Sequence, residues 1–202
     1  MSLTPTPAER RARTRADLRM GLPVCLTLSG SAALVVAVAS LNAERFADMT
    51  AGGAAVLAIT ARRAETLKAR AYDGDLARIA LPAGATIQWA QAVADPTDDL
   101  SSPMKGPFHT ERGGDAGLHR AGLALAKEAR LLPAVLVMPI AEPEVARAQN
   151  LTVLDLSTDL PHVDGAHMTE VVAARLPMAL ARAGRLHIFR PDDGGEEHYA
   201  VE

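Results

Sequence analysis

Two apolar runs near the start of the chain, joined by a very short turn, constrain the fold more than any other feature of the sequence. The runs are Leu22–Leu28 and Ala33–Ala39, and only Ser29-Gly30-Ser31-Ala32 lies between them. Apolar, β-branched runs separated by Gly and Ser are typical of strands, which we expect at Val24–Leu28 and Ala33–Ala39. Such a unit is a natural place to mount catalytic side chains, yet this turn carries no charged residue.

Helices and short apolar strands alternate along the following sequence. The capping box Thr6-Pro7-Ala8-Glu9 predicts a first helix from about Pro7 to Met20. Further helices are expected at Asn42–Thr50, from Thr60 through Lys68, at Thr86–Val93, at Leu118–Leu132 and after Pro143. Further strands are expected at Ala54–Thr60, Arg78–Leu81, Ala134–Met138 and Leu151–Leu154. The alternation predicts a layered α/β (α+β) domain with at least part of its sheet parallel.

The last part of the chain changes character. A helix is expected from about Ala166 to Ala183, with an irregularity at Pro177, and Gly184 ends it. Two alternating runs then flank an Asp-Gly turn, which predicts a hairpin. We therefore expect an α/β domain over residues 1–184 and a hairpin connector over 185–202. A lone hairpin is marginally stable, so it is expected to pack on a further domain outside this chain.

Composition excludes several classes of protein. The formal net charge of −3 and the pI of about 6.1 provide no basic field for nucleic acid or for an acidic membrane surface. No run approaches the ~20 apolar residues of a membrane span. Cys25 is the single cysteine and can form neither an internal disulfide nor a thiolate zinc cluster, so we expect it in the core of a reduced, cytoplasmic protein.

Periodicity disappears from Asp95 to Gly117, which predicts a long loop of the kind that often carries function. Carboxylates and imidazoles gather in and just after this loop, and they are the groups available for a rebuilt site. They are Asp98, Asp99, His109, Glu111, Asp115 and His119. The simpler interpretation is that they are solvated loop residues. Ser29, Gly30 and Ser31 are weak candidates for binding an anion through backbone amides.

Three segments resemble enzymes of riboflavin biosynthesis. The run from Gly21 through Ala39, followed by Gly53–Ala64, resembles the start of the 3,4-dihydroxy-2-butanone 4-phosphate synthase family, and Leu125–Val137 is similar to a late helix and strand of that family. Ile188–His198 resembles the connector that leads, in some bacterial GTP cyclohydrolase II proteins, from an N-terminal domain of this fold into the cyclohydrolase domain.

The resemblance implies the fold of that family, a layered helix/sheet/helix domain with a mixed sheet. The synthase chemistry does not carry over to the matching positions. The resemblance implies an acid-rich loop that binds magnesium between the first two strands, where this chain has Ser29-Gly30-Ser31-Ala32. The family's phosphate-binding segment has no match between Leu81 and Gly117. Its glycine-histidine-threonine-glutamate signature aligns best with Gly117-Leu118-His119-Arg120, with leucine in place of histidine. A shift by one residue places His119 at the histidine position, but the glutamate is absent in either alignment. The resemblance places the cyclohydrolase zinc site beyond the connector, so zinc is expected only in a following domain.

The leading hypothesis is a non-catalytic synthase-like domain with no metal or cofactor of its own. It would form a homodimer and serve in the assembly or regulation of a following GTP cyclohydrolase II domain. The first alternative is a magnesium-dependent phosphosugar enzyme or binding domain, with its site rebuilt in the 95–117 loop. The second is a stand-alone interaction module.

Overall fold

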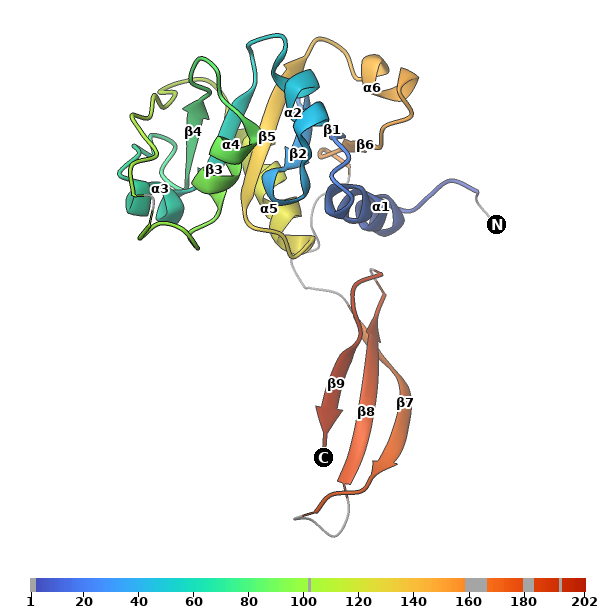
Figure 1. The fold of residues 1–202 in the computed structure, drawn as a ribbon. Helices are drawn as coiled ribbons and strands as arrows, with labels where there is room; N and C mark the ends of the chain where they lie inside the picture. Colours follow the sequence, from blue (N-terminus) through green and yellow to red (C-terminus); the bar gives the residue numbers. More distant parts are fainter. Residues whose placement is uncertain (1–2, 102, 159–166, 180–183, 193) are drawn as a thin grey trace. The chain divides into compact units, whose positions relative to one another are not determined.

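The computed structural model describes residues 3–101, 103–158, 167–179, 184–192 and 194–202 (Figure 1). They form two compact units. The larger unit is Arg13–Thr158, and the smaller contains the described residues after Thr158 together with those before Arg13.

A six-stranded sheet with the order β4-β3-β5-β2-β1-β6 forms the centre of the larger unit. Neighbouring strands are antiparallel except β1 and β6, which run parallel. The mixed sheet and its helices confirm the mixed α/β class expected from the sequence. The strands are β1 (Val24–Leu28), β2 (Ser31–Ala37), β3 (Val56–Thr60), β4 (Leu76–Ala80), β5 (Ala134–Ile140) and β6 (Val153–Asp155).

Helices cover both faces of this sheet. One face packs against α5 (Gly117–Glu128) and against Leu18 in the second half of α1 (Pro7–Arg19). The other face packs against the remaining helices, which follow the sequence predictions closely. They are α2 (Ala43–Thr50), α3 (Ala61–Leu67), α4 (Ile87–Ala94) and α6 (Glu144–Ala148), with a 3-10 turn at Val38–Ser40.

Burial on both faces explains why the strands read as continuous apolar runs. Along β2, Ala33 and Val35 face the α5 side, whereas Leu34 and Val36 face the opposite core. Alternate side chains of a strand point to opposite faces, so a strand between two helical layers needs apolar residues at every position. The predicted core position of Cys25 is confirmed, because its side chain is fully buried.

Helix starts are set by polar side chains that follow strands or loops. Asn42, Thr60 and Thr86 each accept a hydrogen bond from the backbone amide three residues later. These caps satisfy amide groups that the helix itself leaves unpaired. Thr6 and Glu9 form the predicted capping box, in which the Thr6 amide donates to the Glu9 carboxylate at 2.7 Å.

A glycine in the middle of α5 allows the helix to pack closely on the sheet. A Cβ at Gly122 of α5 would lie 2.8 Å from Cγ1 of Val35 and 3.3 Å from Cγ2 of Val135. The missing side chain therefore lets α5 settle directly onto β2 and β5. This contact holds the start of α5 at a fixed place along the sheet.

The smaller unit corrects one sequence prediction. The helix expected over 166–183 is strand β7 (Met168–Leu176), and residues 166 and 180–183 lie outside the described residues. Ala, Glu, Met and Leu in this segment favour a helix. However, Met168–Leu176 pairs antiparallel with the following strand, which satisfies its backbone and overrides that local preference.

The predicted C-terminal hairpin is confirmed, although it belongs to a larger sheet. Its strands β8 (Gly184–Pro191) and β9 (His198–Val201) pair antiparallel, and β7 adds to the other side of β8. Val172, Ile188 and Tyr199 share one face of this sheet with Ala174, Leu186 and Val201. That face is apolar and partly exposed, with Tyr199 63% and Val201 57% exposed.

Among the described residues, no helix combines the length and the hydropathy that a membrane span requires.

Candidate functional site

The turn between β1 and β2 is the first place in the structure where a functional site was expected. Leu28 pairs directly with Ser31, so the turn contains only Ser29 and Gly30. Their φ angles are +50° and +83°, the pair of positive values that a tight two-residue hairpin requires. A Cβ at Gly30 would meet no atom within 4 Å, and Ser29, Gly30 and Ser31 are all exposed. The turn therefore offers no carboxylate, and it is open to solvent.

Sequence reasoning missed one carboxylate at this same edge. Asp155 ends β6, beside Thr27 of β1 in the parallel register. Its Oδ1 accepts hydrogen bonds from the Ser157 hydroxyl at 2.7 Å and from the Ser157 amide at 3.0 Å. These bonds, with a further one from Thr27, hold the pKa of Asp155 below its ordinary value. An Asp-x-Ser sequence directly after an apolar strand was the available signal.

Helix α5 begins beside the same turn. A Cβ at Gly117 would lie 2.7 Å from Cδ2 of Leu28, so the first turn of the helix touches the end of β1. Asp115 accepts a hydrogen bond from the Gly117 amide at 2.9 Å. Leu118, at the position where the resemblance places a histidine, is buried in the core. Arg120, at the glutamate position, is exposed and forms an ion pair with Asp75 at 2.7 Å.

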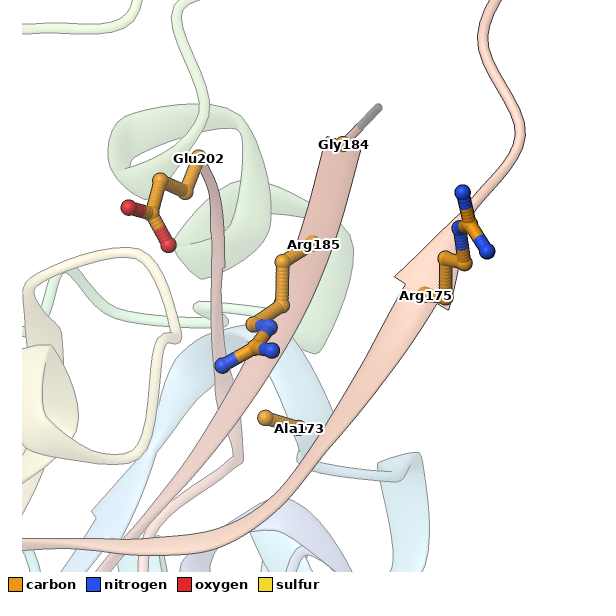
Figure 2. Close-up of a pocket in the computed structure, with 5 residues that line it drawn as sticks. All are labelled: Ala173, Arg175, Gly184, Arg185 and Glu202. Carbon is orange, nitrogen blue, oxygen red and sulfur yellow. The ribbon is translucent and has the colours of Figure 1, made fainter. Parts of the chain in front are cut away.

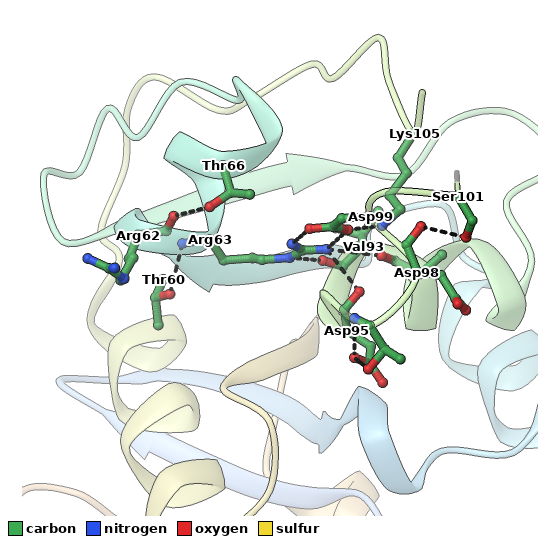
Figure 3. Close-up of polar contacts among 12 residues, drawn as sticks. Thr60, Arg62, Arg63, Thr66, Val93, Asp95, Asp98, Asp99, Ser101 and Lys105 are labelled. Carbon is green, nitrogen blue, oxygen red and sulfur yellow. Dashed lines mark hydrogen bonds and ion pairs between the residues drawn. The ribbon is translucent and has the colours of Figure 1, made fainter. Parts of the chain in front are cut away.

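The loop from Asp95 is anchored at its start by Arg63 of α3 (Figure 3). The Arg63 guanidinium donates to both carboxylate oxygens of Asp99 and also to the carbonyl oxygens of Val93, Ala92 and Asp95. Lys105, whose side chain is 4% exposed, forms a second ion pair with Asp99. Arg63 first and Lys105 second hold the pKa of Asp99 well below its usual range. Asp99 is therefore a fixed anion that joins two cations.

Arg78 of β4 anchors the end of the loop. Its side chain is 3% exposed, and its guanidinium donates to both oxygens of Asp73 at 2.8 and 3.1 Å. It also donates to Glu111 at 2.9 Å and to the Gly113 carbonyl at 2.7 Å. The loop backbone adds a bond from the Glu111 amide to the Arg78 carbonyl at 2.9 Å. In the sequence, Arg78 is a single charged residue within an apolar strand, and nothing there indicates that it holds the loop.

His119 lies near Arg78. Among the described residues, it has the one buried side-chain nitrogen or oxygen without a hydrogen-bond partner. It is 9% exposed, and its Nδ1 has no hydrogen-bond partner. Burial lowers the pKa of His119 from 6.5 to about 4, and the positive charge of Arg78 contributes to the same shift. The negative charges of Asp73 and Asp115 act in the opposite direction but are weaker. The imidazole is neutral at physiological pH.

The six loop candidates thus divide into different environments. Asp99 belongs to the Arg63 and Lys105 cluster, whereas Glu111, Asp115 and His119 surround Arg78. Asp98 and His109 are exposed. In the part of the chain that the structure describes, no three His, Cys, Asp or Glu side chains gather closely enough to hold a metal ion. Burial raises the pKa of the Cys25 thiol, which keeps it protonated.

Comparison with known proteins gives one informative relative. No family model matches the chain. The chain is similar to a protein named GTP cyclohydrolase-2 from Azospirillum brasilense, with 32% identity over 201 residues. The match covers 94% of this chain and 52% of the relative, so the chain spans about half the length of the curated protein that it matches. The chain is therefore related to a GTP cyclohydrolase II protein over nearly all of its own length.

The Arg78 cluster predicts a large difference between two arginine substitutions. Arg78→Gln leaves Asp73 and Glu111 without their buried partner, and we expect a loss of roughly 3 kcal/mol in the free energy of unfolding. Arg120→Gln removes an exposed ion pair and is expected to cost less than about 1 kcal/mol. Urea unfolding followed by the fluorescence of Trp89, the single tryptophan, measures both. Equal losses in the two variants would contradict a buried clamp.

His119 predicts a pH dependence of stability. Its folded pKa of about 4 lies below the ordinary 6.5, so between these values the unfolded chain binds a proton that the folded chain does not. The free energy of unfolding should fall as pH falls through this window, by up to roughly 3 kcal/mol. His119→Gln should flatten that slope, whatever its effect on absolute stability. Urea titrations across the window compare the slopes, and identical slopes would refute the assignment.

Proposed function

We propose that this chain is a synthase-like domain without synthase activity, in a GTP cyclohydrolase II protein of riboflavin biosynthesis. In this proposal it contributes to the assembly or regulation of the cyclohydrolase part. The similarity to a relative named GTP cyclohydrolase-2 supports the pathway, and the unmatched 48% of that relative leaves room for a further domain.

The observation that carries the proposal is the two-residue turn between β1 and β2. In the synthase family that the sequence resembles, the connection between these strands supplies the acids that bind magnesium and move protons. Here Leu28 and Ser31 already pair with each other, which leaves only Ser29 and Gly30 between the strands. A serine and a glycine provide neither hard carboxylate ligands nor a general base.

The acids elsewhere at this edge do not replace that loop. Asp155 directs Oδ1 to Ser157, and Asp115 directs Oδ1 to the start of α5. These two carboxylates therefore do not fit the magnesium site of the family. Cys25, buried with a protonated thiol, does not fit a thiolate zinc site either, so zinc belongs in this proposal only to a following domain.

The rival proposal of a rebuilt phosphosugar site has less support. Two of its carboxylates, Asp99 and Glu111, form ion pairs with Arg63, Lys105 and Arg78. Carboxylates paired in this way fix the path of the loop. A general base instead needs a pKa raised toward neutrality, whereas the pKa of Asp99 is lowered.

The apolar face of the three-stranded sheet supports an assembly role. Val172, Tyr199 and Val201 are each about half exposed or more on that face. Exposed apolar surface of this kind marks interaction sites in soluble proteins. A homodimer of the whole protein, expected from the resemblance, is part of the same proposal.

An activity assay tests the absence of synthase chemistry. Purified chain incubated with ribulose 5-phosphate and Mg²⁺, or Mn²⁺, should form no dihydroxybutanone phosphate above the rate without protein. An active synthase assayed in parallel confirms the conditions, and Trp89 fluorescence confirms that the chain is folded. Product that forms with the chain and disappears in Asp155→Asn or Asp99→Asn would overturn the proposal.

A further inference from the structure

We draw no further inference here: the strongest candidate, the apolar face of Val172, Ile188 and Tyr199 on the three-stranded sheet that also bears the open pocket of Figure 2, carries none, because nothing in the described part of the structure shows what covers that face.

Discussion

The direct pairing of β1 with β2 through two residues is the constraint on which the larger unit depends. The pairing places β2 between β1 and β5, where both of its faces are buried by helices. Gly122 then lets α5 pack closely on β2 and β5, and Gly117 brings the start of that helix against Leu28. A longer loop between β1 and β2 would have to share this edge with α5 and with Asp155. The same short turn that completes the sheet therefore contributes no carboxylate to this edge.

Buried cations organise the rest of the unit. Arg63 fixes the end of α4 and the start of the 95–117 loop, and Arg78 fixes the end of that loop against β4. Removing a charge from water is costly unless its donors find partners, and every nitrogen of both guanidinium groups donates to a carboxylate or a carbonyl oxygen. Asp99 and Glu111 consequently hold the two ends of the loop through these cations.

Most of the larger unit could be predicted because its signals are local. Capping residues such as Thr60 and Thr86, and apolar runs such as 134–138, specify helices and strands through short-range chemistry. The partners of Asp99 and Glu111 could not be predicted, because Arg63 and Arg78 lie 36 and 33 residues away in sequence. Strand β7 was predicted as a helix, because its identity depends on pairing with β8 and not on its own composition. Asp155 was missed for a related reason: only the parallel register of β6 with β1 brings it to the turn.

We propose that this domain contributes to the assembly or regulation of the cyclohydrolase part and has no synthase activity of its own. The most direct measurement uses a fusion in which this chain replaces the matched half of the Azospirillum brasilense relative, compared with the unmatched part of that protein alone. Light scattering gives the mass of each, and GTP hydrolysis gives the activity per subunit. We predict that the fusion forms a dimer or larger assembly with GTP hydrolysis, and that the unmatched part alone has a lower mass and a lower activity per subunit. Equal mass and equal activity with and without this chain would contradict the account.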